Sequence, residues 1–94
     1  MNYYTIDFTN VTDLSAFYQR IIKGLDFPEW CGENPDAIWD MLTGHMEAPA
    51  HITVIGSNNL PRIPAYEFPY IKETFDDTIE WYQDLNKQVI IVYK

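Results

Sequence analysis

Three short runs of the chain have the hydrophobic pattern of β-strands. Residues 3–8 alternate apolar and polar side chains, which predicts a strand with one buried face. A second run covers 51–55 and ends at a Gly-Ser-Asn-Asn turn. The third run, 89–93, is almost continuously apolar, a pattern typical of a strand covered on both faces. We expect the β-branched stretches 52–55 and 89–92 at the centre of the sheet.

Two further stretches have helical spacing. From Leu14 to Gly24, apolar residues recur every three or four positions, and Thr12 is the predicted N-cap. The stretch 70–85 predicts an amphipathic helix with an acidic outer face. Its predicted apolar positions are Ile71, Phe75, Ile79, Tyr82 and Leu85. The segment before it contains three prolines, so we expect it to be irregular or a single short helical turn.

The clearest helix signal begins at Asn34-Pro35. Asn is a favoured N-cap, and Pro suits the first helical position because its missing N–H has no partner there. The predicted helix runs over 35–43 and ends at Gly44, which we expect in the left-handed conformation.

The order of these elements predicts the fold class. Strands separated by helices favour an α/β fold with a small three-stranded parallel sheet and three to four helices packed on it. A chain of 94 residues is the size of one hydrophobic core, so we expect a single domain over 1–94.

Charge narrows the choice of partner. The formal net charge of −8 disfavours nucleic acid and anionic membrane surfaces and favours a basic partner, although it could serve solubility alone. The only cysteine, Cys31, leaves no intrachain disulfide. The N-terminus lacks the pattern of a signal peptide, and no run is long enough to span a bilayer. We therefore expect a cytoplasmic protein.

One face of the helix over 35–43 concentrates candidate binding residues. Asp36, Trp39, Asp40 and Thr43 share this face, opposite an apolar stripe. The stripe consists of Ala37, Ile38, Met41 and Leu42. Trp30 lies in the loop before the helix. Carboxylates beside aromatic anchors are typical of a surface that binds a basic cleft. The alternative is a solvated helix face with Trp39 folded inward.

The segment around this helix resembles a known family. Its residues are Leu25-Asp26-Phe27-Pro28-Glu29-Trp30-Cys31-Gly32-Glu33-Asn34-Pro35-Asp36-Ala37-Ile38-Trp39-Asp40-Met41-Leu42-Thr43-Gly44. This stretch is similar, without a gap, to the signature of the barstar family. The resemblance implies a three-stranded parallel sheet with helices on it. It also implies inhibition of barnase-type guanyl-specific ribonucleases in a one-to-one complex. We expect the inhibitor to be a monomer when it is free.

The resemblance also implies roles for individual residues. Asp40 would be the principal acid, standing in for the scissile phosphate, and Asp36 would be the second acid. Trp30 would stack over the catalytic region of the nuclease. The remaining implied contacts are Asn34, Trp39, Thr43 and Gly44.

Three positions depart from the family pattern. Pro35 replaces a bulky apolar residue, and His45 replaces a common aromatic contact. The family's acid on the last helix has Glu80 as its best counterpart here, but a shift of one residue would place Trp81 there.

Other functions have less support. Asp36 and Asp40 could form a general acid–base pair, but nothing on an exposed helix face would separate their pKa values. We therefore expect no enzyme activity. Cys31, His45 and His51 lack a recognised ligand spacing, so no metal or cofactor is expected. Within the binding class, two alternatives stay open: an immunity protein against a different toxin nuclease, and a regulatory module without a nuclease target.

Overall fold

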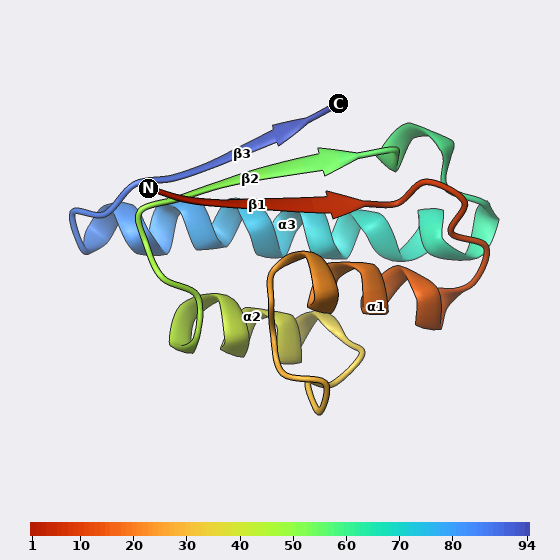
Figure 1. The fold of residues 1–94 in the computed structure, drawn as a ribbon, viewed down its shortest axis with the longest axis horizontal. Coiled ribbons are helices and arrows are strands. Elements are labelled where there is room, and N and C mark those ends of the chain that lie inside the picture. The colour runs from red at the N-terminus through yellow and green to blue at the C-terminus, as the bar shows by residue number, and fades with distance from the viewer.

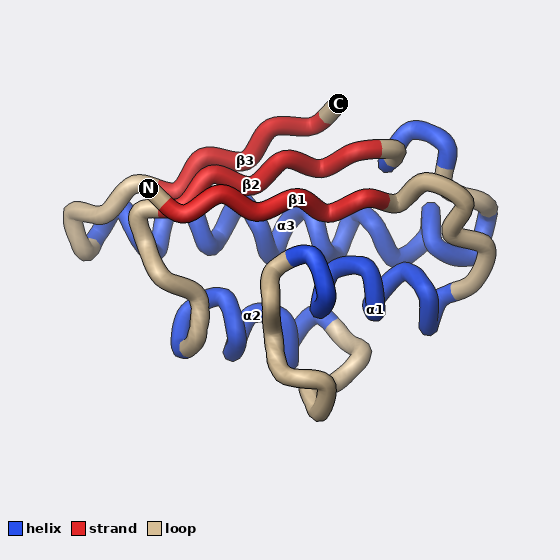
Figure 2. Tube along the Cα trace, viewed as in Figure 1, coloured by secondary structure: helices blue, strands red, loops and turns tan.

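The computed structural model describes residues 1–94 as one three-stranded parallel sheet with three α-helices (Figures 1 and 2). The strands are β1 (Asn2–Asp7), β2 (Ala50–Ile55) and β3 (Val89–Tyr93). The helices are α1 (Leu14–Gly24), α2 (Pro35–Gly44) and α3 (Arg62–Asp84), with a 3-10 turn, η1 (Ser57–Asn59), after β2. The predicted fold class is confirmed.

The strand order β1-β2-β3 leaves one face of the sheet open. Both crossovers move the chain in the same direction across the sheet, so the helices collect on one face (Figure 1). Ile6 of β1 pairs with Val54 of β2, and both are fully buried under the helices. On the opposite face Tyr3 is 76% exposed. The sheet therefore has one buried face and one open face.

The central position expected for 89–92 is wrong. β2 is the central strand, and β3 pairs with β2 alone, at an edge. Ile90 and Val92 alternate onto the open face, where they are only partly buried. A segment rich in β-branched residues packs well in a sheet, but this composition does not indicate whether the strand is central or at an edge.

Twenty buried hydrophobic residues form one continuous core between the sheet and the helices. Its fully buried members include Ile6, Phe17, Ile21, Ile38, Leu42, Ile52, Val54, Ile71 and Phe75. Strands β1 and β2 and every α-helix thus contribute a side chain that water does not reach. None of the helices is long and apolar enough to cross a membrane.

Helix α1 begins one residue later than the sequence suggested. Asp13, not Thr12, is the N-cap, because its Oδ1 accepts a hydrogen bond of 2.7 Å from the backbone N–H of Ala16. At the other end, α1 lies directly against β1. A Cβ at Gly24 would stand 2.5 Å from the carbonyl oxygen of Thr5, so only glycine permits this approach.

Helix α3 begins at Arg62, eight residues before the predicted start, and continues through Pro69. Pro64 falls in the first turn, where an N–H has no helical partner in any case. Pro69 cannot donate to the carbonyl of Ala65, but Ala65 is exposed and water can hydrogen-bond to it. Beyond the end of the helix, Leu85 is 50% exposed and not part of the buried stripe.

Candidate protein-binding surface

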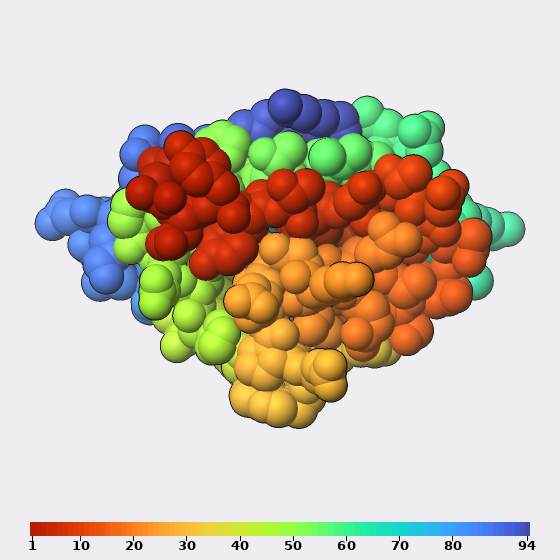
Figure 3. All heavy atoms as spheres, viewed as in Figure 1, coloured from red at the N-terminus to blue at the C-terminus, as the bar shows by residue number.

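Helix α2 lies outside the layer formed by α1 and α3 and packs chiefly against α3. Ile38 and Leu42 are fully buried, while Ala37 and Met41 are partly buried and packed against the core. This confirms the predicted stripe. Together with the loop 25–34, α2 forms the projecting lower part of the molecule in Figures 1 and 3. We call the outer side of α2 with this loop the α2 surface.

The first turn of α2 is held by its predicted cap. Asn34 has an extended backbone, and its Oδ1 accepts a hydrogen bond of 2.8 Å from the N–H of Ala37. The Asn34 amide nitrogen is not used by this cap, so it can donate to a partner. Asn34 therefore both starts the helix and presents a donor on the α2 surface.

Hydrogen bonds attach the loop before α2 to the end and outer side of α1. The N–H of Phe27 donates to the carbonyl of Ile22 at 2.8 Å, and the Phe27 side chain is buried. Glu33 accepts a hydrogen bond of 2.6 Å from Nε2 of Gln19. The loop is thus held in one position relative to the sheet, which pre-organises the surface it forms.

The single thiol lies beneath this loop. Cys31 is 5% exposed, and its Sγ is 3.6 Å from the carbonyl oxygen of Gly32. Burial, and secondarily the negative charge of Asp40, raises the pKa of the Cys31 thiol. The thiol is therefore protonated at neutral pH and is a poor nucleophile.

Asp36 and Asp40 are both exposed on α2, one turn apart. Asp36 occupies the first turn, where the helix dipole favours a negative charge. No Lys or Arg occurs from residue 24 to residue 61, a stretch with six acidic residues. These are Asp26, Glu29, Glu33, Asp36, Asp40 and Glu47. The α2 surface therefore carries negative charge that no cation of its own segment neutralises.

The two tryptophans of this segment have different environments. Trp30 in the loop is 76% exposed, which is unusual for so large an apolar side chain. Trp39 is partly buried, and its ring meets the ring of Trp81 on α3 edge to face, with centroids 6.4 Å apart. Trp30 is thus available to a partner, while Trp39 also joins α2 to α3.

The C-terminal end of α2 differs from the prediction at one residue. Gly44 is the last helical residue and not a left-handed cap, since Gly56 is the only glycine with a positive φ. The hydroxyl of Thr43 donates to the carbonyl of Trp39 at 2.8 Å. His45 is exposed, and its ring forms a T-shaped contact with the ring of Phe27, with centroids 5.9 Å apart. Thr43, Gly44 and His45 therefore continue the α2 surface.

On α3, the residue that reaches this surface by direct contact is Trp81. Glu80, the acid proposed from the sequence, is exposed on the adjacent position of the helix. Trp81, the alternative to Glu80 that the sequence left open, touches both Trp39 and Tyr82, and its contact with Trp39 was not predicted. The spacing of Trp81 from Phe75 does not match the apolar stripe of α3. Only the packing of α2 on α3 brings Trp81 to the α2 surface.

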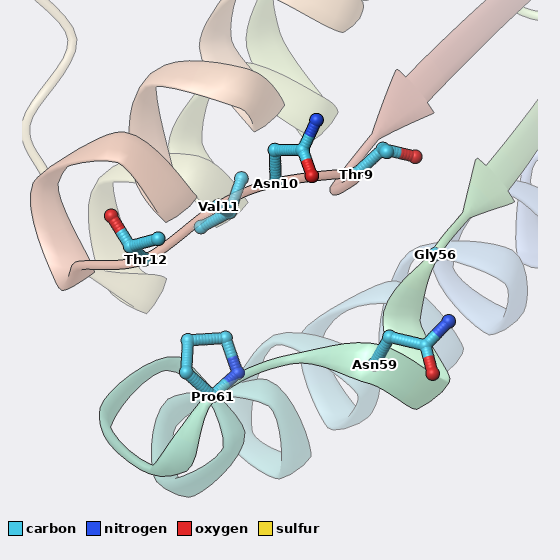
Figure 4. A pocket seen from close by; sticks show the side chains of 7 residues that line it. All are labelled: Thr9, Asn10, Val11, Thr12, Gly56, Asn59 and Pro61. Atoms are coloured by element: carbon cyan, nitrogen blue, oxygen red, sulfur yellow. The ribbon is translucent and has the colours of Figure 1, made fainter.

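The cavity at the end of the sheet has no charged lining residue. A cavity of about 370 Å³ lies at the carboxyl ends of β1 and β2 (Figure 4), where open α/β sheets often bind ligands. Its lining residues are Thr9, Asn10, Val11, Thr12, Gly56, Asn59 and Pro61, none of them acidic or basic. No group of three or more His, Cys, Asp or Glu side chains is arranged to hold a metal ion.

Two comparisons with known proteins identify the class of this layered α/β domain with its projecting acidic helix. The family model described as "Barstar (barnase inhibitor)" matches residues 1–94. The chain is also similar to the Bacillus subtilis (strain 168) protein named "Putative ribonuclease inhibitor YrdF". The two are 28% identical over an alignment of 86 residues, which covers 89% of this chain and 85% of the relative. The chain belongs to the barstar family, whose members are inhibitors and not enzymes.

Proposed function

We propose that this chain is a cytoplasmic inhibitor of a basic, barnase-type guanyl-specific ribonuclease. In this proposal the α2 surface covers the active site of the nuclease in a one-to-one complex. The observation that carries the proposal is the exposed pair Asp36 and Asp40 on a projecting helix, within a segment that has six acidic residues and no Lys or Arg. The family match supports the ribonuclease as partner.

Inhibition of this kind needs no bond chemistry. A ribonuclease binds the scissile phosphate with cationic side chains, and Asp40 would offer those cations a carboxylate instead. Asp36 would pair with a neighbouring cation of the nuclease. Trp30 would cover the catalytic region with an apolar ring, and water would leave the contact. Substrate RNA could then not reach the active site.

Long-range charge would speed the encounter. The C-terminal half of α3 adds five acidic residues, with no Lys or Arg between Lys72 and Lys87. These are Glu73, Asp76, Asp77, Glu80 and Asp84. Such a field attracts a basic nuclease, a behaviour for which the barnase–barstar pair is the known example. We expect the association rate constant to fall steeply as salt rises, whereas the dissociation rate constant changes little.

Calorimetry of the chain against a barnase-type ribonuclease tests the proposal. We expect tight one-to-one binding for the parent chain and a loss of at least about a hundredfold for Asp40→Ala, because a desolvated charge pair would be broken. Asp77→Ala is the matched control, since it removes the same charge from an exposed position on α3. An equal loss in both variants would mean that overall charge, and not the α2 surface, drives binding.

A second candidate is an immunity protein against a different toxin nuclease. It is favoured by the aromatic contact beside the α2 surface, where Trp81 on α3 meets Trp39. A nuclease that places a second cationic side chain at this position would meet the indole ring of Trp81 instead of a carboxylate. Tight binding of another basic nuclease, together with no binding of the barnase-type enzyme, would establish this candidate. Binding of no basic nuclease at all would leave a regulatory module as the remaining alternative.

A further inference from the structure

Helix α2 carries the two acids of the α2 surface but depends on α3 for its orientation. It has ten residues, and only Ile38 and Leu42, on one stripe, are buried. A helix this short is not stable in water by itself. The like charges of Asp36 and Asp40, one turn apart, weaken it slightly further. Contacts with α3 must therefore keep the acidic face of α2 in place.

One of these contacts is made by Trp39, beside the acids. Trp39 lies three residues after Asp36 and directly before Asp40. Its side chain is partly buried, but it is not among the residues that pack against the hydrophobic core. Its ring contacts one other aromatic ring, that of Trp81, with centroids 6.4 Å apart. The acidic face of α2 thus rests on a second indole and not on the core itself.

Trp81, in contrast, is fixed by the core. It is partly buried and packs against the core cluster. Its ring also meets the ring of Tyr82 edge to face, with centroids 4.9 Å apart. Edge-to-face aromatic pairs have a preferred geometry, so each ring limits the orientation of the next. Trp81 therefore connects the core of the protein to the acidic face of α2.

A small rotation of α2 would be enough to disturb binding. Side chains at the rim of a helix lie about 5–6 Å from its axis, so a rotation of about 10° moves a carboxylate by about 1 Å. Hydrogen bonds between a cation and a carboxylate have lengths of about 2.7–2.9 Å and do not tolerate such a shift. If α2 held the right orientation for only part of the time, the apparent dissociation constant would rise by the inverse of that fraction.

We propose that Trp81 is a positioning residue for ribonuclease binding. It holds the ring of Trp39, and this contact keeps Asp36 and Asp40 in the orientation that the nuclease recognises. The proposal rests on the proposed function, because it concerns the same surface and the same partner. It differs from the second candidate described above, since Trp81 needs no contact with the nuclease in this role.

Surface plasmon resonance with an immobilised barnase-type ribonuclease tests this role. Trp81→Leu keeps an apolar side chain against the core but loses the ring. We expect it to raise the dissociation constant about fivefold, within the range that an aromatic pair contributes. Trp81→Phe restores an aromatic ring for Trp39 to contact and should bind within about twofold of the parent chain.

Phe68→Leu is the matched control. Phe68 also lies on α3, about 20 Å from Trp81 along the helix axis, and its ring contacts Phe8 and Tyr93 edge to face. Phe68→Leu therefore removes aromatic contacts from the same helix without touching the pair of tryptophans. Its dissociation constant should equal that of the parent chain. An equal loss in Phe68→Leu and Trp81→Leu would assign the effect to general stability and overturn the proposal.

A double-mutant cycle with Trp39→Leu identifies the route by which Trp81 acts. If Trp81 acts through Trp39, adding Trp81→Leu to Trp39→Leu should change the dissociation constant no further. If the two losses multiply instead, Trp81 contacts the nuclease directly and the proposed role is wrong.

The parent chain and Asp40→Ala separate this proposal from the proposed function. If Trp81→Leu binds as tightly as the parent chain while Asp40→Ala does not bind, only the positioning role fails. If the parent chain binds no ribonuclease, both proposals fail together.

Discussion

The hydroxyl of Tyr82 on α3 donates a hydrogen bond of 2.5 Å to the backbone carbonyl of Leu42 on α2. Leu42 lies in the last turn of its helix, where carbonyls have no helical N–H to accept from. The carbonyl of Met41 is satisfied differently, by the N–H groups of His45 and Met46. Tyr82 thus completes the end of α2 and sets its position on α3.

Removing this hydroxyl should destabilise the fold. We expect Tyr82→Phe to lower the free energy of unfolding by about 1–3 kcal/mol, because the buried carbonyl of Leu42 loses its donor. Urea denaturation measures the change. Tyr70→Phe is the control, because Tyr70 is 60% exposed and should change stability by less than about 0.5 kcal/mol. Equal stabilities of the two variants would show that water replaces the missing donor.

The cap at Asn34 should support both stability and binding. We expect Asn34→Ala to lower the free energy of unfolding by about 1 kcal/mol and Asn34→Asp to retain it, because Asp caps equally well. Asp13→Ala removes the corresponding cap of α1 and should cost a similar amount. Only Asn34→Ala should also weaken ribonuclease binding. A loss of binding in Asp13→Ala would mean that stability, and not the α2 surface, explains both results.

Two helical glycines should respond to alanine in opposite ways. We expect Gly44→Ala to raise the free energy of unfolding by about 0.5–1 kcal/mol, since Gly44 is helical and its Cβ would meet open space. Gly24→Ala should destabilise the chain instead, because the added Cβ would stand 2.5 Å from a β1 carbonyl. Thermal unfolding compares the two. Stabilisation by Gly24→Ala would contradict the close contact of α1 with β1.

Alkaline pH should unfold the chain through its buried tyrosines. Burial, and secondarily the charge of Asp76, raises the pKa of Tyr93 to about 12, from an ordinary value of 10.0. A raised pKa means that the folded state favours the neutral hydroxyl. Its contribution to stability is therefore complete below pH 10 and is lost as pH rises from 10 to 12. Burial raises the pKa values of Tyr18 and Tyr82 in the same direction.

The variant Tyr93→Phe isolates one of these groups. The Tyr93 hydroxyl is buried without a hydrogen-bond partner, so its removal should leave stability at pH 7 unchanged or raise it by about 1 kcal/mol. The fall in the urea midpoint between pH 10 and 12 should also become shallower. An unchanged alkaline fall in Tyr93→Phe would assign the effect to Tyr18 and Tyr82 alone.

Local chemistry made part of this protein predictable from its sequence. The start of α2 follows from Asn34-Pro35, because an N-cap acceptor and a proline at the first helical position act within one turn of backbone. The buried stripe of Ile38 and Leu42 follows from the helical period. The proposed acids Asp36 and Asp40 were found in the same way, from their shared helix face and the family pattern.

Other features depend on contacts between residues distant in the sequence. The prolines at 64 and 69 suggested an irregular segment, but burial of Ile71 and Phe75 stabilises a helix that continues through both prolines. The strand 89–93 lies at an edge because both crossovers move the chain in the same direction across the sheet.

The residues of the α2 surface also fall into these two groups, those predictable from local sequence and those placed by distant contacts. Residues within one helix or one turn of it, such as Asn34 and Asp40, could be named from the sequence, because their spacing alone sets their relative positions. Trp81 reaches this surface only because α2 packs on α3, where Tyr82 holds it. The sequence by itself determined the fold class and the acidic helix. The tertiary structure decided which face of α3 stands beside that helix, since packing between helices depends on the whole core and not on any local pattern.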